Sequence, residues 1–312
     1  MKHAFIMDPL EGVKAWKDTS YFLMLACMEY GHRVCHLDQR DLWLEHDQVY
    51  GRVSWLEVHA EVDHPFTVLE QTVVKMGELD TVWVRTDPPF DRRYFYTTLL
   101  LDYLPAGTRV INRPCGIRNW NEKLAALYYP QYTPSTLVTS DVNAIRSFAE
   151  KQGRVTVKPV DGFGGKGIVF YRRGDNVREL GEATRQGRQW VIVQEYLPAA
   201  AEGDKRILLL NGNPMGAILR VHADGSELNN MDAGGTAHPS SLDARDREIC
   251  SALKKGLVEQ GVFFAGIDII GGMLIEVNVT SPTGLQEMSR FDGVDYHLRM
   301  ISALAGPSEN QQ

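Results

Sequence analysis

Three oxygen-bearing side chains on two consecutive predicted strands are the strongest candidates for a metal site. Glu276 and Asn278 are two residues apart in "MLIEVNVT", so their side chains share one face of a strand. Asp268 lies on the preceding strand, and a three-residue hairpin loop over 271–273 would pair it with Glu276. Carboxylate and amide oxygens suit Mg²⁺, which also takes water and phosphate oxygens. A solvated sheet face is the alternative, but unpaired charges on otherwise apolar strands are costly, which favours the metal.

The segment "KPVDGFGGKGIVF" (158–170) contains the spacing G-x-G-x-x-G at Gly162, Gly164 and Gly167. A dinucleotide-binding turn must open a helix, whereas "IVFYRR" after these glycines is typical of a strand. A Walker-type loop is excluded because Lys166 is followed by glycine and not by Ser or Thr. The segment therefore predicts a flap between two strands and argues against a dehydrogenase.

Such a flap can still hold a nucleotide. Glycines let backbone N–H groups approach phosphate oxygens, and the candidates are Gly162, Gly164 and Gly165. Lys158 on the preceding strand could add a positive charge, whereas no role follows for Lys166. An ordinary glycine-rich hairpin explains the same residues equally well.

Further charged and polar residues lie where anions could bind. Arg206 enters a strand after "EGD" and could neutralise a developing oxyanion, although a charged surface hinge explains it too. Arg85 and Asp87 follow a buried strand at the end where open α/β sheets bind ligands, with a surface ion pair as the alternative. Three residues before the last helix could bind a carboxylate or simply cap that helix: Ser281, Thr283 and Gly284.

Composition limits the class of protein. The chain has 312 residues, 44% hydrophobic and 23% charged, as in a globular protein with two or three domains. A net charge of −7 argues against nucleic acid as the main partner, and no apolar stretch is long enough to span a membrane. The four cysteines show no C-x-x-C spacing, which predicts reduced thiols in a cytoplasmic protein. In "HRVCH", His32 and His36 face away from Cys35 on a strand, so these three are not expected to share a metal ion.

The predicted elements divide the chain into three parts. Strands and helices alternate over 1–117, which indicates a parallel α/β sheet. Over 118–200, a helix at 121–129 precedes strands joined by helices and tight loops, as in a small α+β lid. The part 201–312 begins with a hairpin at Asn211-Gly212 and carries the metal strands. The fold class is therefore α/β, with an α+β lid.

Taken together, these segments resemble the prokaryotic glutathione synthetases of the ATP-grasp superfamily. The matching stretches follow the family order over nearly the whole chain: "MDPL", "KDTS", "VRTDPPFD", "INRP", "NEK", "KPVDGFGGKGI", "QEYLP", "GDKRILLLNG" and "AGIDIIGGMLIEVNVTSPTG". The resemblance implies an N-terminal substrate domain, a central lid and a C-terminal domain, with ATP held between the last two. The family also suggests a homo-oligomer, commonly a tetramer.

The resemblance also implies roles for particular residues. Lys123 and Lys158 would contact ATP phosphates, and Asp268, Glu276 and Asn278 would hold Mg²⁺, or Mn²⁺ in its place. The adenine pocket would be lined by Glu195, Tyr196 and Leu197. The implied reaction joins γ-glutamylcysteine to glycine through an acyl phosphate, with Arg206 steadying the tetrahedral intermediate. This chemistry needs positioning and charge neutralisation more than a protein nucleophile.

One loop departs from the family pattern. "LRVHADGSELNNMDAGG" keeps Arg220 and Asn230, which would contact substrate, but has His222 in place of a proline and Leu228 in place of an arginine. Losing a cation beside anionic substrates could change the γ-glutamyl donor or the amine acceptor. A non-catalytic ATP-binding protein would be expected to lack a metal ligand or Arg206, and all of these residues are present.

Overall fold

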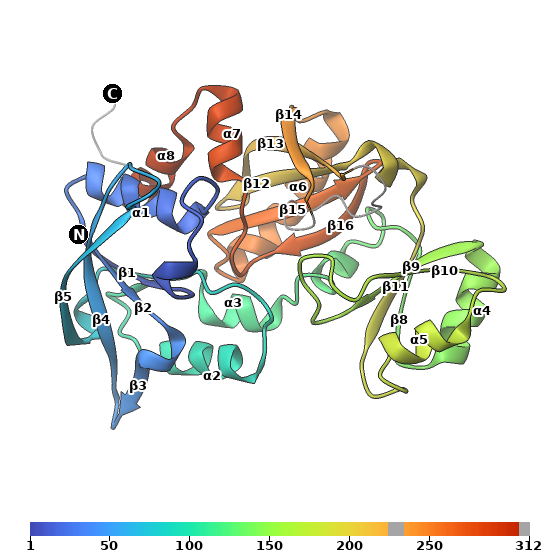
Figure 1. The fold of residues 1–312 in the computed structure, drawn as a ribbon, viewed down its shortest axis with the longest axis horizontal. Helices are drawn as coiled ribbons and strands as arrows, with labels where there is room; N and C mark the ends of the chain where they lie inside the picture. Colours follow the sequence, from blue (N-terminus) through green and yellow to red (C-terminus); the bar gives the residue numbers. More distant parts are fainter. Residues whose placement is uncertain (224–233, 306–312) are drawn as a thin grey trace.

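The computed structural model describes residues 1–223 and 234–305 of the chain. Three β-sheets follow one another along the longest axis of the molecule (Figure 1). A seven-stranded sheet lies at one end, a four-stranded sheet at the other, and a five-stranded sheet between them. Each sheet draws its strands from one of the three predicted parts, while the boundaries at 117 and 200 stay predictions.

The first sheet has the strand order β3-β4-β2-β1-β6-β7, with β5 paired to β4. Its strands are β1 (Lys2–Ile6), β2 (Arg33–Leu37), β3 (Leu42–Glu45), β4 (Gln48–Val58), β5 (Phe66–Lys75), β6 (Thr81–Val84) and β7 (Arg109–Ile111). Strands β2, β1, β6 and β7 are parallel, which confirms the predicted α/β fold class. Their carboxyl ends meet at one edge, where open α/β sheets bind ligands.

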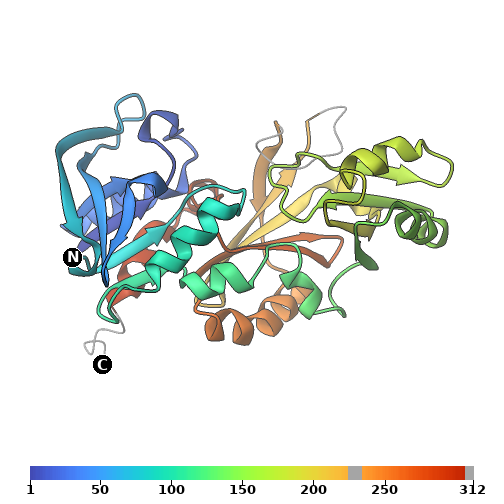
Figure 2. The ribbon, with the colours of Figure 1, turned by 90° about the horizontal axis from the view of Figure 1, so that it is seen from below.

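Helices cover both faces of this sheet. α1 (Thr19–Glu29) lies on one face, and α2 (Arg92–Leu101) and α3 (Pro114–Asn119) lie on the other, nearest the viewer in Figure 2. Successive β1 residues point to opposite faces, so Phe5 packs with α1 while Ala4 and Ile6 pack with α2. Ala4, Phe5 and Ile6 are therefore all buried, as expected of a strand that is covered on both faces.

The four-stranded sheet has the order β10-β9-β11-β8, and all its neighbours are antiparallel. It comprises β8 (Thr136–Thr139), β9 (Arg154–Pro159), β10 (Val169–Arg172) and β11 (Val191–Glu195). The helices α4 (Val142–Gln152) and α5 (Val177–Ala183) pack on it through Ile145, Ala149 and Leu180. Because the glycine loop (residues 160–168) joins two antiparallel strands, the prediction of a flap is confirmed.

The five-stranded sheet has the order β14-β13-β12-β15-β16. It comprises β12 (Asp204–Leu210), β13 (Asn213–Val221), β14 (Thr236–Ser240), β15 (Phe264–Ile270) and β16 (Met273–Asn278). One face packs on α6 (Ala244–Glu259). The other face shares a core with α1, α7 (Leu285–Asp292) and α8 (Tyr296–Ser302), so this sheet and the first one are joined by continuous apolar packing.

A buried asparagine ties these two sheets together. Asn112, just after β7, accepts hydrogen bonds from the backbone N–H groups of Phe263 and Phe264 at 2.8 and 2.9 Å. Its amide nitrogen donates to the carbonyl oxygens of Phe264 and Val279, both at 2.7 Å. With all four bonds made, this side chain fixes the end of the first sheet against the strands that carry the predicted metal residues.

The helix predicted over 121–129 is wrong. A 3₁₀ turn at Ala125–Tyr128 stands there, because the preceding segment lies along β16 and the carbonyl oxygen of Glu122 accepts from the N–H of Val277 at 2.8 Å. Tertiary pairing thus replaces the helical hydrogen bonds. It also brings Glu122 and Lys123 to the cavity described below.

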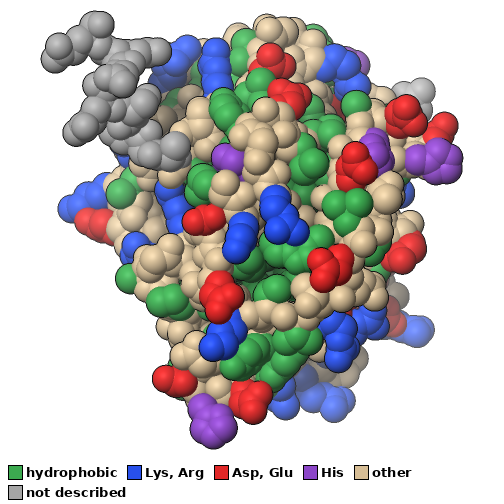
Figure 3. All heavy atoms as spheres, turned by 90° about the vertical axis from the view of Figure 1, so that its left-hand side faces the viewer, with side chains coloured by type: hydrophobic (Ala, Val, Ile, Leu, Met, Phe, Trp, Pro, Cys, Tyr) green, Lys and Arg blue, Asp and Glu red, His purple; other side chains and the backbone are tan. Residues whose placement is uncertain are grey.

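The surface is mixed in character. On the face seen in Figure 3, acidic and basic side chains are interspersed with hydrophobic ones. The edge strand β5, which the sequence did not predict, carries exposed Val68, Leu69 and Val73. Within 1–223 and 234–305, no helix has both the length and the apolar character needed to cross a bilayer.

Candidate active site

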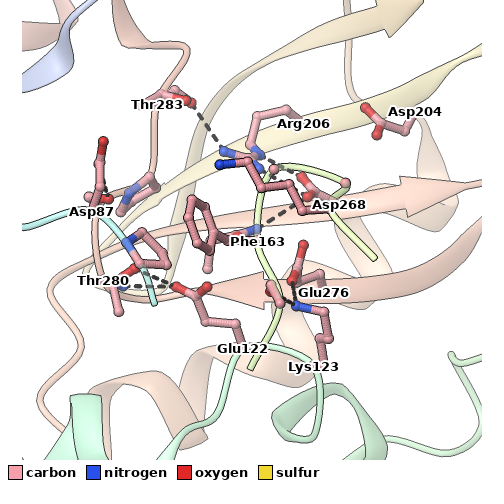
Figure 4. A pocket seen from close by; sticks show the side chains of 18 of the residues that line it. Asp87, Glu122, Lys123, Phe163, Asp204, Arg206, Asp268, Glu276, Thr280 and Thr283 are labelled. Carbon is pink, nitrogen blue, oxygen red and sulfur yellow. Dashed lines mark hydrogen bonds and ion pairs between the residues drawn. The ribbon is translucent and has the colours of Figure 1, made fainter. Parts of the chain in front are cut away.

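A cavity of about 670 Å³ lies where the five-stranded sheet, the glycine loop and the carboxyl edge of the first sheet meet. It brings together most of the residues singled out from the sequence (Figure 4). Those lining it are Arg85, Asp87, Lys123, Lys158, Gly162, Gly164, Gly165, Glu195, Tyr196, Leu197, Arg206, Arg220, Asp268, Glu276, Asn278, Ser281 and Thr283. Residues far apart in sequence therefore share one site.

The predicted pairing of Asp268 with Glu276 is confirmed, but the turn differs from the expected one. The turn consists of Gly271 and Gly272 alone, both with positive φ (56° and 74°), and Ile270 pairs with Met273. A bulge between Asp268 and Ile269 then restores the register. A shorter turn plus a bulge thus gives the same alignment of the two carboxylates.

Four buried charges form what we call the arginine–aspartate network: Asp204, Arg206, Arg220 and Asp268. Arg206 Nη2 lies 2.9 Å from Asp268 Oδ2, and its Nε donates to the other carboxylate oxygen. Arg220 bridges the two acids, with Nε donating to Asp204 and Nη2 lying 3.0 Å from Asp268 Oδ2. The network joins β12, β13 and β15 across their shared face.

The network sets the ionisation of its members. Burial disfavours the Asp268 carboxylate, but the two guanidinium groups outweigh burial and hold its pKa well below the usual range. Burial raises the pKa of Asp204, which faces Arg220 but also lies near the Asp268 charge. Asp268 is thus the firmly ionised acid of the site.

The residues beside the network fit a hard divalent cation. Asp268 and Glu276 offer carboxylate oxygens. The side-chain nitrogen of Asn278 donates to Asp268 Oδ2 at 3.2 Å and to the Gly266 carbonyl at 3.3 Å, so the amide oxygen of Asn278 is the atom left to ligate. An all-oxygen donor set is what Mg²⁺ and Mn²⁺ prefer.

Two lysines add positive charge on the opposite wall. Lys123 Nζ lies 3.0 Å from Glu276 Oε1 and donates to the carbonyl oxygen of Gly162, which ties the glycine loop to the metal strand. Burial disfavours its charge, but Glu276 outweighs burial and raises the pKa of Lys123. Lys158 Nζ donates to Gln194 Oε1 at 3.1 Å, and desolvation lowers the pKa of Lys158.

The glycine loop covers the cavity without being packed into a core. Gly164, Gly165 and Gly167 have φ values of 60°, 76° and 75°, a backbone conformation that favours glycine. The Lys166 ammonium lies 4.8 Å from the centre of the Phe163 ring, on the loop itself. No residue from 160 to 168 is buried.

The predicted adenine residues stand beside an apolar slot. Glu195 ends β11 and is followed by Tyr196 and Leu197; the Tyr196 N–H donates to the Arg154 carbonyl oxygen at 2.9 Å. The apolar side chains that line the cavity on this side are Ile168, Phe170, Ile270 and Ile275. Such a slot, with backbone groups at its rim, suits a planar heterocycle.

The other end of the cavity carries Arg85. Its Nε donates to Ser20 Oγ and its Nη2 to the Pro282 carbonyl, both at 3.0 Å. The buried Nη1 has no hydrogen-bond partner among the described residues. Ser281 Oγ donates to Asp87 Oδ1 at 2.7 Å, and burial raises the pKa of Asp87. An unpaired buried donor of this kind is suited to an anionic ligand.

Some predicted residues are placed otherwise. Gly284 does not line the cavity: it precedes α7 with φ 108°, and a Cβ there would lie 3.0 Å from Ile218 Cδ1, so packing accounts for its glycine. Asn230 and Leu228 fall outside the described residues. His222 is described, and its Nδ1 lies 3.0 Å from the Ala223 carbonyl oxygen.

The sequence did not point to several residues of the site, Glu122 and Asp204 among them. Glu122 Oε1 accepts from Thr280 Oγ1 at 2.7 Å and from the N–H groups of Val279 and Thr280 at 3.0 and 3.1 Å. Burial, with the nearby Glu276 charge, raises the pKa of Glu122. Lys14 and Lys17 also line the cavity. Two motifs could have pointed to them: Glu122 precedes Lys123 in "NEK", and Lys17 begins "KDTS".

Comparisons with known proteins agree with this geometry. The N-terminal domain of prokaryotic glutathione synthetase matches residues 1–118, and the ATP-grasp domain of the same family matches residues 122–293. The "Glutathione synthetase" of Gloeobacter violaceus is 43% identical over 302 residues, 94% of this chain and 93% of that protein. The protein of the same name from Pseudomonas syringae pv. tomato is 39% identical over 303 residues, 96% of this chain and 95% of that one.

Solved structures share the fold at lower identity. D-cycloserine synthetase DcsG superposes with a TM-score of 0.66 at 19% identity, covering 98% of this chain and 99% of the other. A RimK domain protein ATP-grasp from Sphaerobacter thermophilus gives a TM-score of 0.61 at 15% identity, covering 98% and 100%.

The glycine loop and the strands β15 and β16, with their oxygen-bearing side chains, enclose one cavity. Together with the family matches, this defines an ATP-grasp enzyme, and the chain is an ATP-dependent ligase that forms C–N bonds. More specifically, it belongs to the prokaryotic glutathione synthetase family, whose members use ATP with a divalent metal.

Proposed function

We propose that this chain joins the terminal carboxylate of γ-glutamylcysteine to the amine of glycine, consuming ATP and releasing ADP and phosphate. The observation that carries the proposal is the single cavity that holds the two lysines, the arginine–aspartate network and the oxygen-bearing strand pair. Its two ends are chemically different, with an apolar slot at one and the unpaired Arg85 nitrogen at the other. This suits a nucleotide and a small anionic substrate placed end to end.

ATP binds between the four- and five-stranded sheets in this proposal. The adenine occupies the apolar slot beside Glu195, Tyr196 and Leu197, and Lys158 and Lys123 contact the phosphates. The backbone N–H groups of Gly162, Gly164 and Gly165 approach the same phosphates when the glycine loop closes. Closure also excludes water, which protects a reactive acyl phosphate from hydrolysis.

Mg²⁺ is the proposed metal, with Mn²⁺ as the alternative of similar preference. Asp268, Glu276 and Asn278 would hold it through oxygen atoms. The metal supplies neutralisation of phosphate charge when bound. Glu276 would ligate through a carboxylate oxygen, and its ion-pair partner Lys123 would lie close to the phosphates.

The chain's residues act by orientation and charge. A donor carboxylate oxygen bonds to the γ-phosphorus of ATP while the bond from that phosphorus to the bridging oxygen of ADP breaks. The glycine amine then attacks the acyl carbon, phosphate leaves with the C–O electron pair, and the amine loses a proton. Arg206 is positioned beside Asp268 and Thr283 to face the oxyanion of the tetrahedral intermediate.

The donor peptide lies toward the first sheet. Arg85 Nη1 offers a donor for a carboxylate, while Asp87, Ser281 and Thr283 present polar groups to the rest of the peptide. In this proposal Arg220 contacts the substrate, and its two aspartate partners in the network hold its guanidinium group in place. Asn230, which lies outside the described residues, remains a predicted substrate residue on sequence grounds alone.

A second candidate keeps the ligase chemistry but changes the substrates. His222 and Leu228 stand where the family pattern has a proline and an arginine, so this segment of the sequence has one cation fewer than the family pattern. A different γ-glutamyl donor or a different amine acceptor is the function that this substitution favours. A non-catalytic ATP-binding protein is disfavoured because the metal residues and Arg206 are in place.

The test measures ADP release from ATP and Mg²⁺ with γ-glutamylcysteine against a panel of amino-acid acceptors, with the products identified by mass spectrometry. Turnover with glycine and a product of the mass of glutathione is expected. Turnover with another amine but none with glycine would replace the first candidate by the second. ATP binding without turnover on any acceptor would contradict both.

Location and assembly stay predictions. The cysteine pattern predicts a cytoplasmic protein, and the family resemblance suggests a homo-oligomer, commonly a tetramer. The exposed Val68, Leu69 and Val73 of the edge strand β5 support an assembly, because apolar side chains on a strand with one open edge favour contact with another surface. Light scattering coupled to size-exclusion chromatography would measure it.

A further inference from the structure

A second group of potential metal ligands lies at the amino ends of the parallel strands of the first sheet, whereas the cavity lies at their carboxyl ends. His3 is near the start of β1, Cys27 is in the last turn of α1, and His32 immediately precedes β2. The cavity, by contrast, is lined by Met7 and Asp8, which follow the end of β1. None of His3, Cys27 and His32 takes part in the proposed ligase reaction.

The geometry of this group is compact. One ligand atom from each of His3, Cys27 and His32 lies within 4.8 Å of the other two. His3 Nε2 and His32 Nδ1 are 3.0 Å apart, and the two rings stack with centroids 5.0 Å apart. His3 and Cys27 are fully buried, whereas His32 is half-buried and gives access from solvent.

Local structure explains how the three residues meet. α1 ends just before Gly31, whose φ of 69° reverses the chain, and the His32 N–H donates to the Cys27 carbonyl at 2.9 Å. The parallel pairing of β1 with β2 then sets His3 opposite Val34 and beside the incoming turn. Of the segment "HRVCH", only His32 belongs to the group: His36 Nε2 instead lies 3.1 Å from the Asp8 carbonyl oxygen.

The protonation states suit ligation. Burial lowers the pKa of His3 to about 4 and also lowers that of His32, with a contribution from the nearby N-terminal ammonium. The Asp80 carboxylate opposes these shifts in part. Both imidazoles are therefore neutral at pH 7, as a metal requires. Burial raises the pKa of the Cys27 thiol, so metal binding must release its proton.

One hydrogen bond has to give way. Trp83 Nε1 donates to His3 Nδ1 at 3.4 Å, which places the His3 proton on Nε2, where it faces His32. Ligation through Nε2 moves that proton to Nδ1 and loses the contact with Trp83. Trp83 is fully buried, so the metal bonds gained must outweigh the cost of leaving its indole N–H without this acceptor.

We propose that His3, Cys27 and His32 form a binding site for Zn²⁺, separate from the ligase cavity, with water as the fourth ligand. Two imidazole nitrogens and one thiolate form a typical zinc donor set, whereas the ligase cavity offers only oxygens. Tetrahedral Zn²⁺ with bonds of about 2.0–2.3 Å needs ligand atoms roughly 3.3–3.6 Å apart, which small side-chain shifts reach from the present positions. The bound ion would link the start of β1, the end of α1 and the start of β2.

The test uses Co²⁺ as a spectroscopic substitute for Zn²⁺ on the full chain, with excess Mg²⁺ present to occupy oxygen sites. One equivalent of Co²⁺ is expected to produce a thiolate-to-cobalt charge-transfer band, which Zn²⁺ then removes. The band should be lost in Cys27→Ser and in His32→Gln. It should persist in Cys250→Ser, a matched control because Cys250 is another buried, free thiol.

Further readouts keep the test decisive. Circular dichroism checks that each variant is folded, and His32→Gln changes a half-buried residue that the core does not require. Zn²⁺ should raise the Tm of the original chain and of Cys250→Ser but not of His32→Gln. A band of equal strength in folded Cys27→Ser and Cys250→Ser, or no band in the original chain, would overturn the site.

Discussion

The arginine–aspartate network and the glycine loop face each other across one cavity, and they are built on opposite principles. All four residues of the network are buried and joined to one another across three strands. No residue of the glycine loop is buried, and three of its glycines have positive φ. The difference indicates a rigid, charged floor that positions the reacting groups and an adaptable cover that closes over them.

The largest expected effect concerns Glu276, which pairs with Asp268 beside the network. Glu276→Ala removes a proposed metal ligand and the partner of Lys123, so kcat should fall by about 10²–10³ or more. Steady-state ADP release measures it, and circular dichroism should show an unchanged fold. Glu259→Ala, at an exposed ion pair on α6, is the control and should leave kcat unaltered. Full activity in Glu276→Ala would refute the metal role.

The stability of the network is the next test. Arg220→Met leaves the buried Asp204 carboxylate without its guanidinium partner and Asp268 with Arg206 alone, so the free energy of unfolding should fall by about 3 kcal/mol. Arg178→Met breaks an exposed pair with Glu182 and should cost less than about 1 kcal/mol. Urea unfolding measures both. Equal losses would remove the distinction between the buried network and an ordinary surface pair.

The glycine loop should respond in binding more than in stability. Gly164→Ala places a Cβ in open space but at φ 60°, which costs about 1 kcal/mol of backbone strain. Gly174→Ala makes the same change at φ 92° in a turn away from the cavity. Both should lower stability similarly, while only Gly164→Ala should raise the KM for ATP several-fold. A matching rise in Gly174→Ala would contradict a role for the loop in nucleotide binding.

The smallest expected effect concerns pH. Desolvation lowers the pKa of Lys158, so its ammonium loses its proton at lower pH than an ordinary lysine at about 10.4. Below that pKa the charge is present, and above it kcat/KM for ATP should fall. Lys158→Arg stays protonated and should move this alkaline limb to higher pH. An identical pH profile in the variant would show that Lys158 does not control the limb.

The sequence predicts local patterns well. The alternating strands and helices over 1–117 and the strand after the glycines are both present, because each depends on neighbouring residues. The pairing of Asp268 with Glu276 was also predicted, although a bulge and a two-residue turn produce it. Alternation of side chains along a strand limits the possible registers, so different turns can give the same face.

Long-range contacts account for what was missed. The 3₁₀ turn near Glu122 depends on pairing with β16. The bridge from Arg220 to Asp268 depends on β13 and β15 lying on either side of β12, which the sequence pattern of one hairpin does not predict. The His3, Cys27 and His32 group joins three separate elements, so only the assembled fold brings them together. No local spacing signals such a group.

The central claim is that the donor carboxylate becomes phosphorylated before the amine attacks. The most direct measurement uses γ-glutamylcysteine labelled with ¹⁸O in its terminal carboxylate, with ATP, Mg²⁺ and glycine, and determines the isotope content of the phosphate released. Transfer of one labelled oxygen from the dipeptide to phosphate in each turnover is the predicted result. Phosphate free of label, formed together with glutathione, would contradict the account.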